Sequence, residues 1–324
     1  MPVNLDQTSD EVRMKILRYY GAVDMHDLYR QTGIDAFSVW HEHAAVVPIY
    51  RGWRGEDPSS TYGPWGKVRQ HIDPLADETL ESYRWPKVEE FDFSTLKESA
   101  LAVKANDMTV STGHAGVGFQ HHVELRGYEQ CLLDLTDPGW MREYIDCNRA
   151  FFLPYFETLF AHAAGEIDIL RADEDMGGME RMMISPAMWR RYYKPLWAEV
   201  FAIAKRHGAK VWMHSCGYCR PVVEDFIEIG VDILNPVPPY VKGSDPLEMK
   251  QVYGERLVLD GAVDHIQVMI WGTPATVREE VRRRIDQCAA RGGFILGASQ
   301  GFTEDVPMEN IAAMYEAALR YGGY

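Results

Sequence analysis

The chain has 324 residues, of which 46% are hydrophobic and 25% charged, so it is long enough to bury a large core without disulfide or metal cross-links. Its formal net charge of −15, from 48 acidic and 33 basic residues, argues against nucleic-acid binding, because phosphate recognition needs a clustered basic surface. The sequence begins without a signal-peptide pattern, has no apolar run long enough to cross a bilayer and carries 5 cysteines, so we expect a soluble, cytoplasmic protein without disulfides.

The first third of the sequence is irregular. Val12, Ile16 and Tyr20 recur at helical spacing, and residues 51–90 are rich in Gly, Pro, Trp and Asp. This pattern predicts a helix followed by a long ordered loop region. No Pro/Gly/Ser-rich linker divides the chain, so we expect one domain over residues 1–324, with an N-terminal part (1–105) of helices and loops and a regular core (106–324).

Short apolar runs alternate with amphipathic stretches in the rest of the chain, an arrangement that predicts a parallel sheet covered by helices. A side-chain cap followed by proline marks three of the helix starts, at Asp137-Pro138, Ser185-Pro186 and Thr273-Pro274. A dinucleotide-binding sheet is the alternative, but no strand is followed by G-x-G-x-x-G. We therefore predict a (β/α)8 TIM barrel with an irregular N-terminal extension. The apolar runs are residues 108–112, 167–172, 210–215, 231–236, 256–264 and 294–299.

In such barrels the reactive groups follow the carboxyl ends of the strands. The run at 210–215 ends in His214-Ser215-Cys216, and two residues apart on a strand place His214 and Cys216 on the same side. Imidazole and thiolate are both zinc ligands, so the pattern predicts a catalytic zinc site. A buried histidine beside an inert cysteine is the alternative. Cys219 completes a C-x-x-C and could add a ligand or form a redox pair.

Three carboxylates, Asp173, Glu174 and Asp175, follow the run at 167–172. Adjacent carboxylates repel one another unless a cation or a proton lies among them. We predict that Glu174 and Asp175 are catalytic, that Glu174 also binds the metal, and that Asp173 and Met176 contact substrate. The alternative for the acidic residues is a solvated loop that caps a helix, and for Met176 it is core packing.

Histidines follow the run at 108–112, and Asp264 ends the run at 256–264. We predict that His114 takes part in acid/base chemistry and that His121 and Asp264 contact substrate. The alternatives are scattered surface histidines and, for Asp264 as for Asp260, a helix cap.

A family resemblance is carried by residues 125–135, 172–178, 185–195, 210–217, 228–237, 261–264, 272–281 and 292–317. On these residues the sequence, from about residue 105 to residue 324, resembles the uroporphyrinogen decarboxylase superfamily, and it is more similar to the zinc-dependent, cobalamin-linked methyltransferase branch than to true uroporphyrinogen decarboxylases. The resemblance implies the (β/α)8 barrel, and it implies that His214 and Cys216 are zinc ligands. The R-Q-A-G-R motif of the decarboxylases is absent, which disfavours their activity.

In the methyltransferase branch the third zinc ligand is a distant cysteine, which would fall near Gln300, where this sequence has no thiol. Either a carboxylate from residues 173–175 or Asp264 then completes a three-ligand site, or the site does not bind zinc. Gln300 is expected at the substrate.

The resemblance implies a zinc-dependent methyltransferase that moves a methyl group between a small methylated substrate, such as a methyl ether, and a corrinoid protein or a thiol. The implied cofactors are Zn²⁺ and a cobalamin carried by a partner protein, and a homodimer is one expected assembly. Two alternatives remain open. One is a metal-free decarboxylase or lyase acting on a polycarboxylate such as a porphyrinogen, with Arg126, Arg181 and Arg220 as candidate binding residues; the other is a non-catalytic barrel that serves as a scaffold or sensor.

Overall fold

The computed structural model describes residues 10–24, 27–28, 31, 45–46, 49–50, 79–83, 85–105, 108–112 and 116–323. Within these residues, seven strands form one sheet in the order β1-β4-β5-β6-β7-β8-β9, and every neighbouring pair is parallel. The strands are β1 (Ala45–Val46), β4 (Ser111–Thr112), β5 (Ile169–Asp173), β6 (Lys210–His214), β7 (Ile233–Asn235), β8 (Val258–Asp260) and β9 (Phe294–Ile295). A separate antiparallel pair joins β2 (Ile49–Tyr50) to β3 (Phe91–Asp92).

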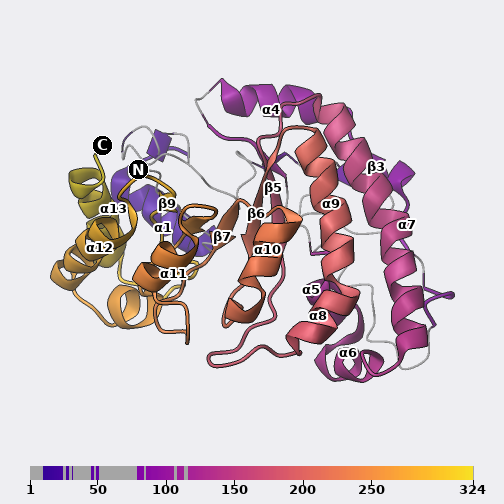
Figure 1. The fold of residues 1–324 in the computed structure, drawn as a ribbon. Helices are drawn as coiled ribbons and strands as arrows, with labels where there is room; N and C mark the ends of the chain where they lie inside the picture. Colours follow the sequence, from indigo (N-terminus) through magenta and orange to yellow (C-terminus); the bar gives the residue numbers. More distant parts are fainter. Residues whose placement is uncertain are drawn as a thin grey trace.

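Helices separate successive strands and cover the outside of the sheet (Figure 1). The side chains of Asp137, Ser185 and Thr273 accept hydrogen bonds from the first turns of α7, α8 and α12, so the three predicted helix starts are confirmed. The helices are α1 (Asp10–Tyr20), α4 (Leu96–Lys104), α5 (Phe119–Arg126), α6 (Tyr128–Asp134), α7 (Pro138–Ala163), α8 (Pro186–Tyr192), α9 (Lys194–Arg206), α10 (Val223–Ile229), α11 (Pro246–Tyr253), α12 (Pro274–Cys288) and α13 (Met308–Tyr321), with 3-10 turns η1 (Val88–Glu90) and η2 (Arg220–Val222) and the π-helix η3 (His265–Ile270).

The inner face of the sheet has its own small apolar cluster, formed by Ile169, Trp212, Ile233 and Ile295. A much larger cluster fills the space between the outer face and the helices. Because side chains alternate along a strand, the residues two positions after Trp212 and Ile233 also lie on the inner face. These residues are the last ones of β6 and β7, so the C-terminal ends of the strands present polar side chains above an apolar floor.

The strand register lines up the polar ends of three strands. Asp173 pairs with His214, and His214 pairs with Asn235. Below this row Arg171 is fully buried, and its guanidinium lies 4.6 Å from the centre of the Trp212 ring.

The predicted α/β barrel class is confirmed. The helix predicted around Val12–Tyr20 is also confirmed, as α1, which packs beside α13. Residues 51–78, where a long loop region is predicted, lie outside the described residues. Among the helices of the described part of the chain, none is both long and apolar enough to cross a membrane.

The loop that follows β5 lies at the same end of the molecule as helices α5, α6 and α8, which is the lower end in Figure 1.

Candidate functional site

His214 ends β6 and is buried, with 4% of its surface exposed. Its Nδ1 lies 2.7 Å from Oδ1 of Asn235. An amide oxygen only accepts hydrogen bonds, so Nδ1 carries a proton, and when the ring is neutral Nε2 presents a lone pair. Nε2 in turn lies 3.5 Å from Oδ1 of Asp175, a second acceptor. Two acceptors that face each other repel unless a proton or a metal cation lies between them.

Cys216 follows two residues after His214 and is half-buried. Its backbone N–H donates to Oδ1 of Asp175 at 2.7 Å, and its Sγ lies 3.3 Å from Oε1 of Gln300. The structure therefore brings together four of the predicted site residues, His214, Cys216, Asp175 and Gln300, from the ends of β5 and β6 and from the loop that follows β9.

The donor atoms of this cluster suit zinc in kind. Two nitrogen or oxygen ligands about 2.1 Å from a tetrahedral zinc ion are about 3.4 Å apart, and a sulfur and an oxygen ligand about 3.6 Å apart. The distance from His214 Nε2 to Asp175 is 3.5 Å, and that from Cys216 Sγ to Gln300 is 3.3 Å. The residues lie in adjacent pairs, however, and within the described ranges no group of three or more His, Cys, Asp or Glu side chains forms a metal cluster. The donor set fits by its chemistry, and ligand convergence would need side-chain movement.

Glu174 is fully buried on the outer face of the sheet. Its carboxylate accepts hydrogen bonds from the backbone N–H groups of Phe119 (3.1 Å) and Gln120 (3.4 Å) at the start of α5 and from the Trp189 indole (2.8 Å) in α8. A Cβ atom at Gly118 would collide with this carboxylate, so the approach requires glycine. Burial raises the pKa of Glu174 to about 7. These contacts tie α5 and α8 to the end of β5.

Asp175, not Glu174, is the carboxylate that the structure places beside His214. The predicted role of Glu174 as a catalytic metal ligand gains no contact here, because the alternation of side chains along the chain turns Glu174 toward the helices. Asp173 is fully buried, and its Oδ1 lies 3.4 Å from the Arg171 guanidinium.

The other predicted site residues lie in different surroundings. Asp264 caps η3, since its Oδ1 accepts from the backbone N–H groups of Ile266 and Gln267 at 2.9 and 2.8 Å. This is the helix-cap alternative. His121 is buried in α5, where its Nδ1 lies 3.0 Å from the Tyr144 hydroxyl. Met176 is fully buried in the main core. His114 lies outside the described residues.

Sequence reasoning missed Asn235, Tyr240 and Ser299. Burial raises the pKa of Tyr240, and the charge of a Cys216 thiolate would raise it further, whereas Ser299 opposes the rise. Asn235 could have been found, because it is the polar residue that ends an apolar run, just as His214 is. Nothing comparable in the sequence marks Tyr240, which lies in the loop after β7.

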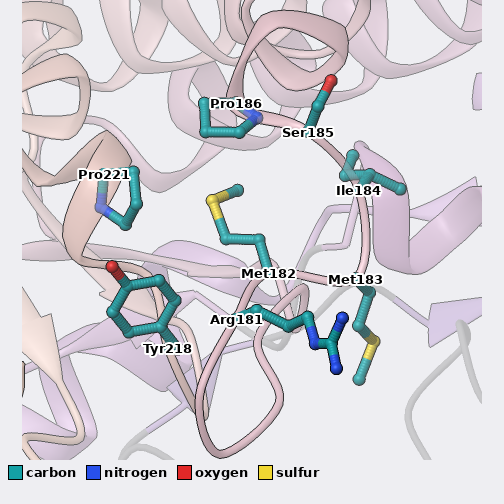
Figure 2. A pocket seen from close by; sticks show the side chains of 8 residues that line it. All are labelled: Arg181, Met182, Met183, Ile184, Ser185, Pro186, Tyr218 and Pro221. Atoms are coloured by element: carbon teal, nitrogen blue, oxygen red, sulfur yellow. The ribbon is translucent and has the colours of Figure 1, made fainter. Parts of the chain in front are cut away.

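A pocket of 310 Å³ lies between the hairpin that follows β5 and the loop that follows Cys216 (Figure 2). Its lining residues follow Asp175 and Cys216 closely in the sequence. The Met182 side chain extends into it. Cys219 is buried, and burial raises the pKa of its thiol to about 12, which disfavours the reactive thiolate. The pocket is lined by Arg181, Met182, Met183, Ile184, Ser185, Pro186, Tyr218 and Pro221.

The fold and the position of the cluster define an α/β barrel with a polar site at the C-terminal ends of its strands. Residues 141–321 match the family described as uroporphyrinogen decarboxylase (URO-D), and the chain belongs to this family. The predicted superfamily is therefore confirmed.

Two methyltransferases are similar to the chain. It is 26% identical over 184 residues to the methylated-thiol–coenzyme M methyltransferase of Methanosarcina mazei; the match covers 56% of this chain and 45% of the relative, so the chain spans about half the length of this curated relative. A solved structure of a methyltransferase from Methanosarcina mazei superposes with a TM-score of 0.66 at 16% identity, over 99% of this chain and 94% of that chain. This second likeness supports the fold.

Proposed function

We propose that the protein is a zinc-dependent methyltransferase that moves a methyl group from a small methylated compound, such as a methyl ether, to a corrinoid protein or a thiol. The observation that carries the proposal is the pair formed by His214 Nε2 and Asp175 Oδ1, which lie 3.5 Å apart, with Oδ1 also accepting from the Cys216 backbone N–H. Membership of the family and the two similar methyltransferases support the reaction class.

His214 Nε2, Cys216 Sγ and a carboxylate oxygen of Asp175 would hold the zinc ion, with Gln300 next to the thiol. One thiolate and one carboxylate together balance the charge of the ion. When bound, zinc would act as a Lewis acid that polarises the atom carrying the methyl group, or would lower the pKa of a thiol acceptor.

The protein's own residues prepare this site. Asp175 accepts from the Cys216 backbone N–H and so fixes the start of the loop that carries the thiol. Asn235 holds the His214 ring in one tautomer, as partners of metal-binding histidines commonly do. The neighbouring pocket, with Met182 extending into it, offers an apolar and adaptable wall to a small substrate.

The contacts of two candidate basic residues weigh against a decarboxylase that binds a polycarboxylate. Arg126 is bonded to Asp134 at 2.7 Å, and Arg220 to Glu248 at 2.9 Å, so both guanidinium groups already pair with carboxylates. Arg181 lines the pocket.

The test is the zinc content of protein purified without added metal, together with transfer from a methyl ether to reduced cobalamin. We expect about one zinc per chain, loss of transfer on chelation and recovery when zinc is restored. Full transfer by a His214→Ala variant would contradict the proposal.

A further inference from the structure

Asn235 has a hydrogen-bonding capacity that the protein does not use. The residue is fully buried at the end of β7, and its Oδ1 accepts from His214 Nδ1. Its Nδ2, which carries two N–H donors, has no hydrogen-bond acceptor among the described residues. A buried donor without an acceptor destabilises the folded protein, because it loses its hydrogen bonds to water. Such a group is retained at little cost only where a ligand or water supplies the acceptor.

The unused donors belong to the side chain that contacts the candidate ligand His214. Because Asn235 bonds to His214 and follows Ile233 by two residues, its side chain is on the inner face of the sheet. Beside it, Gly261 has φ +71, and a Cβ atom there would lie 3.4 Å from Nδ2 and 2.9 Å from the Ala298 carbonyl oxygen. Glycine at 261 therefore keeps the side of the amide clear.

We propose that Asn235 Nδ2 donates to the substrate oxygen that carries the methyl group, and that the substrates are therefore methyl ethers and not methylated thiols. An amide N–H bonds well to oxygen, whereas a thioether sulfur is a weak acceptor. The inference rests on the proposed function and names the substrate class of that site. It separates this chain from its relative, whose name specifies a methylated thiol.

The Asn235 N–H donors would also stabilise the transition state of the methyl transfer. In the transfer, the nucleophile of the acceptor, a thiolate or a reduced corrinoid, supplies the electron pair of the new bond to the methyl carbon. The carbon–oxygen bond breaks with its electron pair left on the oxygen, which then takes up a proton from solvent. Negative charge therefore develops on the atom that faces the Asn235 N–H groups, and a donor already in place stabilises that charge.

Substitutions of Asn235 can separate the role of its amide oxygen from that of its amide N–H groups. Asn235→Asp has the same shape and keeps an oxygen that accepts from His214 Nδ1, but it replaces the N–H donors with a second acceptor. Asn235→Leu removes both. A matched control is Asn148→Asp: Asn148 is also fully buried, its Nδ2 donates to the Val117 carbonyl at 3.3 Å, and its Oδ1 has no partner among the described residues.

The experiment measures the dissociation constants of anisole and thioanisole, an ether and its sulfur counterpart, with no methyl acceptor present, and zinc affinity by chelator competition. We expect Asn235→Asp to weaken anisole binding about 10-fold, as the loss of about 1.4 kcal/mol predicts, with little change for thioanisole and with zinc retained. Asn235→Leu should also lower zinc affinity about 10- to 100-fold. Asn148→Asp should change neither the ratio of the two probe affinities nor the zinc affinity.

Equal weakening of both probes in Asn235→Asp, or an unchanged anisole affinity, would overturn the inference even if the wild type binds zinc and transfers methyl groups. Absence of zinc from the wild type would instead contradict the zinc site, and the ratio of the two probe affinities would still decide the role of Asn235.

Discussion

In the described part of the chain, two buried histidines, His122 and His214, lie within 4 Å of an aspartate, and the partners on the far side of their rings differ. His122 lies among helices, stacked on the rings of Trp140 and Tyr144. Its Nε2 is 3.2 Å from Asp134, and its Nδ1 is 2.7 Å from the Tyr193 hydroxyl, which can donate. A neutral ring with its proton on Nε2 therefore satisfies both contacts.

His214 has the opposite arrangement. In a neutral ring its proton is used on Nδ1 by Asn235, so the nitrogen that faces Asp175 carries a lone pair. The lesson is that a carboxylate near a buried histidine does not by itself indicate a site. The informative feature is the partner on the far side of the ring, because it decides whether the near nitrogen is a donor or a metal ligand.

Removing each histidine in turn tests most directly whether His214, and not His122, binds zinc. We expect His214→Ala to lose its zinc and to lower methyl transfer at least ~1,000-fold, because the ligand and the ordered site are both lost. His122→Gln should keep about one zinc per chain. Metal analysis and transfer rates on the two folded variants check this, and equal zinc loss in both would remove the distinction.

The adjacent carboxylates Glu174 and Asp175 are also expected to differ in their effect on zinc affinity. Asp175→Asn should lower zinc affinity about 10- to 100-fold, since an amide is a poorer ligand than a carboxylate. Glu174→Gln should leave zinc affinity within about 3-fold, because the Glu174 carboxylate is bonded to α5 and α8. Chelator competition measures both constants, and a larger effect at Glu174 would restore it as the ligand.

The pH dependence of stability tests the environment of His122. Burial lowers the pKa of His122 below its ordinary value of 6.5, so the unfolded chain binds a proton that the folded protein does not. The free energy of unfolding should therefore fall as pH drops below about 6.5, by up to ~2 kcal/mol at pH 5. Urea unfolding of wild type and His122→Gln at pH 7 and pH 5 measures it, and the variant should lose less stability on acidification. The lowered pKa of Asp134 adds a loss in the same direction at lower pH.

The smallest effect is expected at Cys219. Because burial raises the pKa of its thiol to about 12, we expect it to act neither as a ligand nor as a nucleophile. Cys219→Ala should keep the zinc content and change the transfer rate less than about 2-fold, whereas Cys216→Ala should abolish both. A large loss in Cys219→Ala would show that the C-x-x-C acts as a pair.

Much of the fold could be predicted from the sequence, because alternating apolar runs and proline-marked caps report local structure directly. The side-by-side placement of His214 and Cys216 follows from strand spacing in the same way. The three acidic residues 173–175 show the limit of prediction from the sequence. The same alternation separates Glu174 from Asp173 and Asp175, but only if the strand continues in register past its last hydrogen bond, which the sequence does not report. The position of Gln300 beside Cys216 depends on how the last loop folds back, a contact across 84 residues.

The close approach of two loops has a consequence for protein engineering. The backbone of Gly177 and Gly178 lies against that of Gly217, and the Tyr218 N–H donates to the Gly178 carbonyl at 2.7 Å. Because main-chain atoms make this junction, side chains farther along the hairpin can be exchanged without loosening the Cys216 loop. The exposed residues 181 and 183, which line the pocket, are therefore suitable positions for directed-evolution libraries that reshape the pocket.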